Sequence, residues 1–253
     1  ALERLLQRRR LEQPARTLVV ASGKGGVGKT NLAVNLAIAW RQRQRRVLIL
    51  DADLGLGNVE MLCGLEARQH LGAFLAGAAD LDEVIEVGPA GIWCAAGGSA
   101  LIEAPELDEE AWRRLSAALL RFDQGPQLVL IDLPAGLGRS VRASIAAARD
   151  ILLVTTPEPT ALADAYAVVK ATATGNATAR IHVVINQARG DDDGRRAFQR
   201  LERAASAFLG YRLRCAGIVP ADPAVGRAVR GQRPLLLDAP WAPASVAVRR
   251  VAA

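Results

Sequence analysis

Short runs of Val, Ile and Leu alternate with longer amphipathic segments along most of this chain of 253 residues. The runs are apolar throughout, which is typical of strands buried on both faces of a parallel sheet. They lie at 17–22, 46–51, 91–96, 127–132, 150–156, 180–186 and 214–220. Apolar residues at helical spacing predict helices at 31–42, 108–122, 140–148, 161–173 and 194–208, and a helix-rich stretch up to about 87. We therefore predict a doubly wound α/β fold, a mainly parallel sheet with helices on both faces.

Residues 15–253 are predicted to form a single domain, because half of the chain is apolar and no low-complexity linker divides it. An Arg-rich, helical arm is predicted at 1–14, and the end of the chain at 234–253 is interpreted as a Pro/Ala-rich tail. Gly190 with Asp191 to Asp193 is interpreted as a surface turn. No apolar run approaches the length of a membrane span, and no secretory signal is visible, so we expect a cytoplasmic protein.

Cysteine and tryptophan positions indicate packing and not chemistry. Cys63, Cys94 and Cys215 are odd in number and form no CxxC pair, so we expect reduced thiols in the core. The four tryptophans, Trp241 among them, are expected at core or edge positions. The net charge of +6 permits an acidic partner such as nucleic acid or an anionic membrane. The near-exclusive use of arginine as the basic residue is equally explained by a biased coding composition.

A glycine-rich loop between a predicted strand and a predicted helix carries the clearest chemistry. Residues 23–30 match G-x-x-x-x-G-K-T, whose backbone N–H groups surround a phosphate while the helix N-terminus adds partial positive charge. The expected nucleotide is ATP or ADP. Lys29 is expected to contact the β and γ phosphates of ATP, or the β phosphate of ADP, and the Thr30 hydroxyl to ligate Mg²⁺. The predicted nucleotide-binding residues of the loop are Gly23, Lys24, Gly25, Gly26, Val27, Gly28, Lys29, Thr30 and Asn31.

Three carboxylates follow buried strands at the edge where such sheets bind ligands. Asp53 is expected to orient the attacking water and to contact the metal, with Asp51 helping to hold magnesium or that water. Asp132 is expected to hold magnesium through a water molecule. Each could be a helix N-cap or turn former if it stood alone, but three beside a phosphate loop favour function. Gly136 and Gly138 would let the loop after Asp132 respond to the γ-phosphate.

The stretch KGGVGKT at 24–30 resembles the deviant Walker A motif of the MinD/ParA family of ATPases. The resemblance continues through DADLGLGN, DLPAG, TTPEPTALADAY and GIVPAD, in the family's order, and covers about residues 16–238. It implies an ATPase that forms an ATP-dependent homodimer, in which Lys24 reaches the phosphates of the partner's nucleotide. Lys24, Lys29, Asp53 and Asp51 are then the catalytic candidates. By the same match, Asn186 and the segment Pro220, Ala221 and Asp222 would frame the adenine.

Within that family, Asn31 and the stretches DADLGLGNVE and PEPTALADAY look most like the flagellar-number regulators of the FlhG (FleN) type, whereas LPAG looks more like MinD. This resemblance implies a switch that controls the number or placement of flagella. It also implies two partners besides a second copy of the chain. One is the flagellar GTPase FlhF, or another flagellar assembly or transcription protein, met by the arm with Leu2, Leu5 and Leu6 on one face. That arm could equally be a solvated basic helix that packs a few leucines on the domain. The other is an anionic membrane, met by the C-terminus, although the weak apolar face there favours packing on the domain.

Other members of the wider class remain as alternatives. A partition or cell-division positioning ATPase would bind DNA or membrane. Its contact with DNA phosphates could come from the cluster Arg41, Arg43, Arg45 and Arg46. Because such charge runs are more often solvated, nucleic acid is the less favoured partner. An iron–sulfur reductase needs a cysteine soon after the strand that ends at Asp132, and residues 128–150 contain none. A tyrosine autokinase needs a tyrosine cluster at the tail, which this chain lacks.

Overall fold

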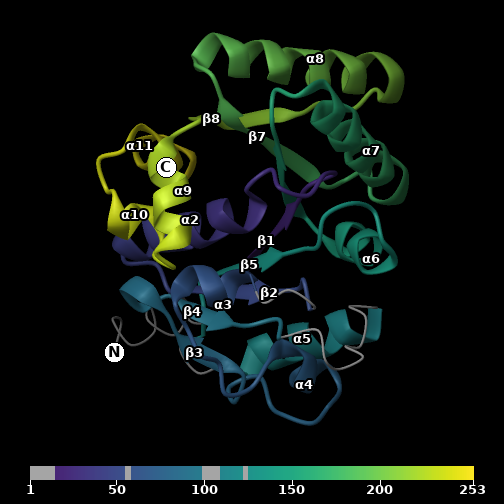
Figure 1. The fold of residues 1–253 in the computed structure, drawn as a ribbon. Helices are drawn as coiled ribbons and strands as arrows, with labels where there is room; N and C mark the ends of the chain where they lie inside the picture. The colour runs from purple at the N-terminus through teal and green to yellow at the C-terminus, as the bar shows by residue number, and fades with distance from the viewer. Residues whose placement is uncertain (1–14, 55–57, 99–108, 122–124) are drawn as a thin grey trace, which may run out of the picture.

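The computed structural model describes residues 15–54, 58–98, 109–121 and 125–253. A single sheet of eight strands runs through the middle of the molecule with helices on both sides (Figure 1). Its strand order is β3-β4-β2-β5-β1-β6-β7-β8. The strands are β1 (Arg16–Ala21), β2 (Val47–Asp51), β3 (Ile85–Val87), β4 (Trp93–Ala95), β5 (Leu128–Asp132), β6 (Asp150–Thr155), β7 (Arg180–Ala188) and β8 (Arg214–Pro220). The predicted doubly wound α/β fold is confirmed.

All neighbouring strands of the sheet are parallel except the edge pair, β3 and β4. The described helices are α2 (Lys29–Gln42), α3 (Asn58–Cys63), α4 (Leu71–Leu75), α5 (Glu109–Arg121), α6 (Arg139–Ala147), α7 (Pro159–Gly175), α8 (Asp191–Leu209), α9 (Pro223–Arg230), α10 (Leu235–Asp238) and α11 (Pro243–Val251), with a 3-10 turn at Pro89–Gly91. The short antiparallel strand β3 was not predicted, because three residues are too few to show a period.

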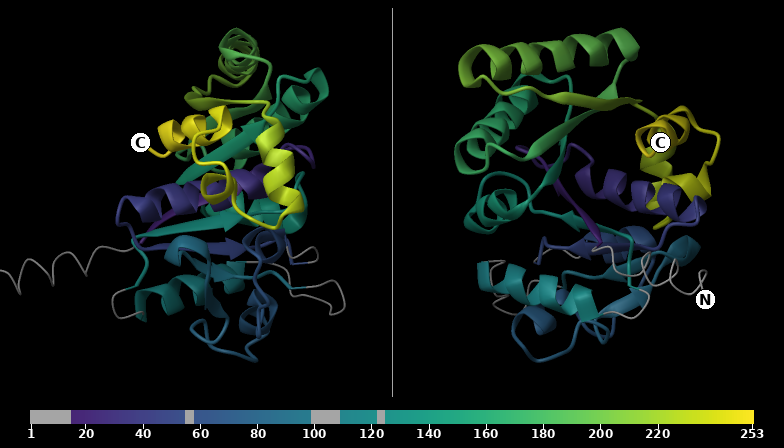
Figure 2. Two further views of the ribbon diagram at one scale, coloured as in Figure 1. Left: turned by 60° about the vertical axis from the view of Figure 1, so that its left-hand side comes forward. Right: turned by 180° about the vertical axis from the view of Figure 1, so that it is seen from behind.

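Two apolar clusters cover the two faces of the sheet. One contains residues of α2, α3, α9, α10 and α11, and the other contains residues of α4 to α8. Figure 2 shows α4 to α8 as a layer of separate helices, and the C-terminal helices α9 to α11 gathered beside α2. Because both faces are covered, the central strands are buried along almost their whole length, as the continuous apolar runs predict.

The structure corrects one sequence interpretation and adds helices to a second segment. Asp191 to Asp193 do not form a surface turn but the first turn of α8, where carboxylates meet the partial positive charge of the helix N-terminus. The Pro/Ala-rich tail forms α10 and α11, which were not predicted as helices. Pro243 suits the first position of α11, and Ala244 and Val248 of this helix are buried against the core.

Two expectations about single side chains are also wrong. Cys63 and Cys94 are buried free thiols, but Cys215 is exposed on the edge strand β8. Trp241 is 87% exposed between α10 and α11, so it is not a packing residue. The arm at 1–14, with Leu2, Leu5 and Leu6, lies outside the described residues. None of the helices in the described ranges combines the length and the apolar composition that a membrane crossing needs.

Candidate nucleotide site

The predicted phosphate loop connects the end of β1 to the start of α2. Gly26 and Gly28 have φ angles of 78° and 83°, in the left-handed region that glycine adopts most readily. Gly23 packs so closely on α7 that a Cβ atom there would overlap the backbone carbonyl of Asp164. The glycines at these positions are therefore required by backbone conformation and by packing. They leave a loop without side-chain bulk directly before a helix N-terminus, which suits a phosphate.

Two side chains from β7 hold the loop in this shape. Asn186 Nδ2 donates to the carbonyl of Val27 at 2.8 Å, and Gln187 Nε2 donates to the carbonyl of Gly26 at 3.2 Å. Gln187 has a φ of 55°, which a residue other than glycine adopts only when its surroundings hold it. Asn186 was predicted to frame adenine, and its observed bond is to the phosphate loop. Gln187 was not predicted, because no motif marks it.

A buried ion pair joins the loop helix to β5. Lys29 Nζ lies 2.8 Å from Asp132 Oδ1, with side-chain exposures of 8% and 0%. Burial raises the pKa of Asp132, and the nearby Lys29 and Thr30 side chains lower it by less. Asp132 Oδ2 is buried and has no hydrogen-bond partner among the described residues. A carboxylate oxygen left unpaired beside a phosphate loop fits a hard cation such as Mg²⁺ or one of its waters.

The Asp51 carboxyl group is buried and hydrogen-bonded to the backbone, unlike a carboxylate that is open to a metal ion. It is fully buried at the end of β2. Its Oδ1 accepts a bond from the Asp53 N–H at 3.1 Å, and its Oδ2 accepts one from the Val59 N–H at 3.0 Å. Burial, and next the charge of Asp132, raise the pKa of Asp51 to about 7. Both oxygens are thus used to shape the segment after β2, which makes Asp51 a positioning residue for Asp53.

Asp53 lies two residues beyond the strand and is half-buried. Its charge contributes to raising the pKa of Asp132, so the two carboxylates face a common region. A Cβ atom on Gly97 would come within 2.9 Å of the Asp53 carbonyl oxygen, so the chain after β4 passes directly beside this segment. No hydrogen bond of the Asp53 carboxylate to a described residue is present. Asp53 is therefore available to a water or a cation.

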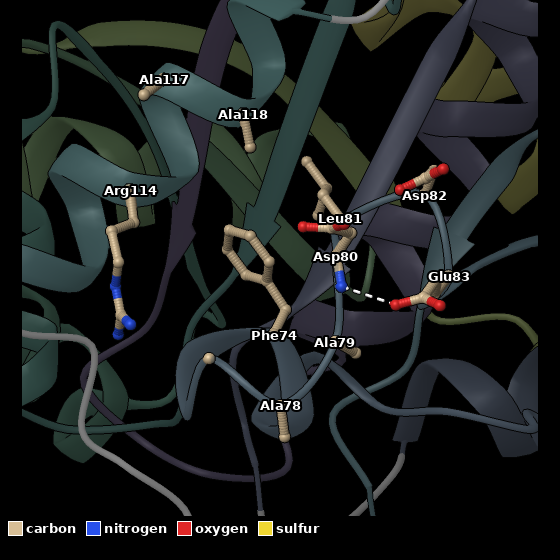
Figure 3. Close-up of a pocket in the computed structure, with 11 residues that line it drawn as sticks. Phe74, Ala78, Ala79, Asp80, Leu81, Asp82, Glu83, Arg114, Ala117 and Ala118 are labelled. Atoms are coloured by element: carbon tan, nitrogen blue, oxygen red, sulfur yellow. Dashed lines mark hydrogen bonds between the residues drawn. The ribbon is translucent and has the colours of Figure 1, made fainter.

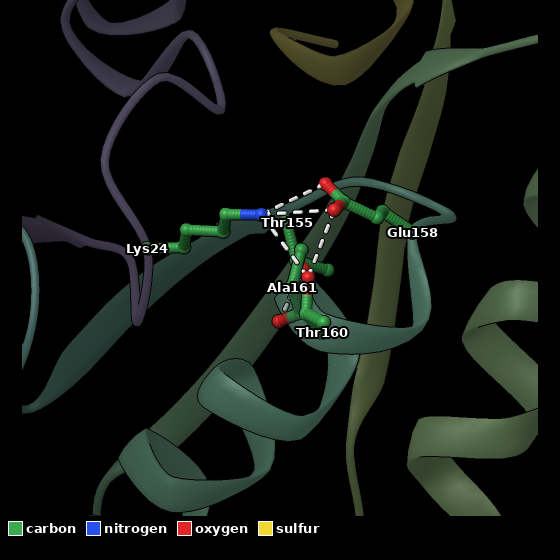
Figure 4. A network of polar contacts seen from close by, with 5 residues as sticks. All are labelled: Lys24, Thr155, Glu158, Thr160 and Ala161. Carbon is green, nitrogen blue, oxygen red and sulfur yellow. Dashed lines mark hydrogen bonds and ion pairs between the residues drawn. The ribbon is translucent and has the colours of Figure 1, made fainter.

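Lys24 does not join the buried pair. Its Nζ lies 2.9 and 3.0 Å from the two carboxylate oxygens of Glu158 and 3.0 Å from Thr160 Oγ1 (Figure 4). Glu158 is the N-cap residue of α7, and its pKa is lowered chiefly by the hydrogen bond from Lys24. The Lys24 and Glu158 side chains are 38% and 55% exposed. Lys24 is thus held at the surface, where it can be reached from outside the protomer.

The remaining predicted residues join the C-terminal helices to this region. The Asp222 carboxylate accepts bonds from the N–H groups of Ala224 at 2.8 Å and Ala244 at 3.1 Å, so it caps both α9 and α11. Asn31 is contacted by Asn35, whose Oδ1 accepts the N–H of Leu236 in α10 at 2.8 Å. Asn35 was not predicted. Asn35 therefore connects α2, the helix that follows the phosphate loop, to α10. Asp222 connects the segment predicted to frame adenine to α11.

Away from the phosphate loop, a concavity of about 770 Å³ lies between α4 and α5 (Figure 3). Phe74 and Leu81 supply apolar surface, and Asp80, Asp82 and Glu83 stand on one side. None of the predicted nucleotide-site residues lines it. It is a separate feature of the molecule.

A glycine loop between the first strand and its helix, with a buried lysine–carboxylate pair beneath it, defines a P-loop nucleoside triphosphatase. Residues 18–235 match the family described as the CobQ/CobB/MinD/ParA nucleotide binding domain. The chain belongs to this family and is an ATPase. It is 36% identical over 239 residues to the antiactivator FleN of Pseudomonas aeruginosa, covering 94% of this chain and 85% of FleN.

Other relatives agree with this placement. The flagellum site-determining protein YlxH of Helicobacter pylori is 30% identical, over 88% of this chain and 76% of YlxH. Among solved structures, the cell division ATPase MinD of Pyrococcus furiosus superposes with a TM-score of 0.78 at 25% identity, covering 94% of this chain and 97% of MinD. MinD of Pyrococcus horikoshii, in complex with Mg-ADP, superposes with a TM-score of 0.75 at 23% identity, covering 94% of each chain.

Proposed function

We propose that this ATPase is an ATP-dependent dimerisation switch that slowly hydrolyses ATP to ADP and phosphate and controls the number or placement of flagella. The observation that carries the proposal is the position of Lys24. The buried pair of Lys29 and Asp132 completes the phosphate loop within one protomer. Lys24 is held outside that pair, at the surface, by Glu158. A lysine placed in this way is free to act on a second protomer.

The chemistry within one protomer follows from the groups around the loop. Backbone N–H groups and Lys29 hold the phosphates, and the Lys29 charge balances the charge that develops on them. Thr30 and Asp132 would hold Mg²⁺, with Asp53 beside it, and the ion when bound neutralises phosphate charge. Asp53 accepts a hydrogen bond from the attacking water and orients it. Asp51 fixes the backbone of Asp53 and thereby the direction of that bond.

The change of state follows from how weakly Lys24 is held. An exposed ion pair contributes little to stability because water and salt compete for both partners. The phosphates of a nucleotide on a second protomer carry more negative charge than Glu158, so Lys24 moves to them when two protomers meet face to face. After hydrolysis and phosphate release this attraction falls, Lys24 returns to Glu158, and the dimer separates.

The flagellar role rests on similarity to FleN and YlxH, whose names connect them with flagella. A second copy of the chain is the first proposed partner, and the flagellar GTPase FlhF, met through the arm at 1–14, is the second. The predicted membrane contact through the C-terminus is not supported by the packing of α11, because Ala244, Ala247 and Val248 of that helix are buried. The second candidate function, partition or division positioning on DNA, lacks a specific observation in its favour.

Light scattering tests the switch directly. The mass of the wild-type protein should double with ATP and Mg²⁺ and stay that of one chain with ADP. Lys24→Ala should stay monomeric with ATP while still binding nucleotide. Lys170→Ala is the matched control, because Lys170 is the third lysine of the chain and is exposed on α7. A wild-type protein that is monomeric with ATP, or a Lys24→Ala variant that dimerises normally, would refute the proposal.

A further inference from the structure

A cleft of about 330 Å³ opens at the edge of the sheet opposite the phosphate loop. Its lining comes from the first residues of β1, β5, β6, β7 and β8, whereas the phosphate loop follows the last residue of β1. In a parallel sheet these ends lie on opposite edges, so the cleft is separate from the nucleotide site. Its volume lies within the range of small-molecule sites, about 300–1,000 Å³.

The inner part of this cleft is apolar. Leu18, Leu130 and Leu152 come from neighbouring strands and belong to, or pack on, the apolar cluster beneath α2 and α11. Trp40 of α2 and Val251 of α11 also line it, in the region where α11 lies beside α2 and β8 (Figure 2). The Trp40 indole N–H already donates to a backbone carbonyl at the end of α11, at 2.9 Å. The indole therefore offers this cleft its apolar ring and no free donor.

The outer part of the cleft carries an excess of positive charge. Arg180 donates to both oxygens of Asp150, at 2.8 and 2.6 Å, and His182 lies 3.2 Å from the same carboxylate. Asp150, the single carboxylate among the described lining residues, is therefore already paired. Arg16 and Arg214 also line the cleft, and both are exposed. Neither forms an ion pair within the described part of the chain.

The two arginines without ion pairs stand at different ends of the cleft. β1 and β8 are separated by β6 and β7, which places them three strand spacings apart, about 14 Å. Arg214 is in register with His182 and lies at the end where Arg180 is also found. The apolar floor extends from there toward Trp40. One end of the cleft thus suits an anionic group, and the middle suits an apolar chain.

We propose that this cleft binds one anionic amphiphile, a small molecule with a carboxylate head on an unbranched apolar chain, as in a fatty acid. The head forms charge-assisted hydrogen bonds with Arg214, because Arg180 is occupied by Asp150. The chain lies over Leu18 and Leu128, the partly exposed leucines of the lining, beside the Trp40 ring. A single molecule fits better than a lipid surface, because the apolar residues are recessed beneath α2 and α11.

Titration calorimetry with decanoate, below its micelle concentration, tests this site on the full chain. We expect one decanoate per chain, and binding about tenfold weaker in Arg214→Gln, since bonds to a charged group are lost. Arg212→Gln, an exposed arginine two residues earlier that does not line the cleft, should bind within about twofold of wild type. Decanol, which lacks the charge, and acetate, which lacks the chain, should each bind at least about tenfold more weakly than decanoate.

Tryptophan emission locates the ligand. Decanoate should change the emission of the wild-type protein, and this change should disappear in Trp40→Phe while the heat of binding remains. An unchanged melting temperature and unchanged ADP binding in Arg214→Gln would show that the variant is folded. The proposal is overturned by an absence of saturable decanoate binding, by equal affinity of wild type and Arg214→Gln, or by decanol binding as tightly as decanoate. Arg214-dependent binding to phosphatidylglycerol vesicles without decanoate binding would instead make this a membrane contact and overturn it as well.

Discussion

Replacing Asp51 by asparagine should change how the stability of the protein depends on pH. Burial raises the pKa of Asp51 from 3.8 to about 7 in the folded protein. Between these two values the folded state holds a proton that the unfolded state releases, so stability is fully present below the unfolded pKa and falls as the pH rises toward 7. Each pKa unit corresponds to about 1.4 kcal/mol. Between pH 5.5 and pH 8.5 the free energy of unfolding falls only up to about pH 7, that is, over about 1.5 pH units. The loss of stability due to Asp51 in this interval is therefore about 2 kcal/mol.

Urea unfolding at several pH values measures this effect. Over that interval the wild-type protein should lose about 2 kcal/mol more than Asp51→Asn, which has no titrating group at this position. Asp132, whose pKa burial also raises, is present in both proteins, and because its charge and that of Asp51 act on each other, the measured difference belongs to the pair. Asp192→Asn is the control, because Arg195 lowers the pKa of Asp192 and places its titration below the interval. A wild-type curve parallel to that of Asp51→Asn would refute the raised pKa of this buried carboxyl group.

Three further substitutions, with Gly25→Ala as a control for the first, test the packing of the site. Gly23→Ala should lower the free energy of unfolding by about 2 kcal/mol, because its Cβ meets the Asp164 carbonyl, whereas Gly25→Ala, with open space around it, should match the wild type in urea unfolding. Asn186→Ala should weaken ATP binding about fivefold in calorimetry, because the bond that holds the Val27 carbonyl is lost, and wild-type affinity would contradict that role. Asp222→Ala should cost about 1–2 kcal/mol through two lost caps, and an unchanged melting temperature would argue against them.

The strands and most of the helices follow directly from the sequence, because continuous Val, Ile and Leu runs have few other uses in a chain of this composition. The beginning of α8 was missed, since three aspartates after a glycine are as typical of a turn as of a first helical turn. The three-residue strand β3 was missed because it is too short to show alternation. Helix α10 was missed because four residues are too few to show a helical period, and α11 because its apolar positions are alanines and valines beside proline, without a bulky Leu or Phe.

Within the site, the phosphate loop was predictable because its residues are contiguous. The contacts that position it were not, because they join distant parts of the chain. Glu158 holds Lys24 across 134 positions, and Asn186 holds Val27 across 159. Asp51 illustrates a different limit. Its place at the end of a strand suggested a role in holding magnesium or the attacking water, but only the fold shows that both of its oxygens accept backbone N–H groups.

The central claim is that Lys24 acts on the nucleotide of a second protomer. Mixing two inactive variants tests it most directly. Lys24→Ala retains Asp53, and Asp53→Ala retains Lys24, so a dimer of one of each contains one complete site. ATP hydrolysis should be near zero for each variant alone and should return in the mixture to no more than about half of the wild-type rate, since a mixed dimer keeps one Lys24 and has one working site of two. A mixture no more active than its separate components, or a Lys24→Ala variant with full activity alone, would contradict the account.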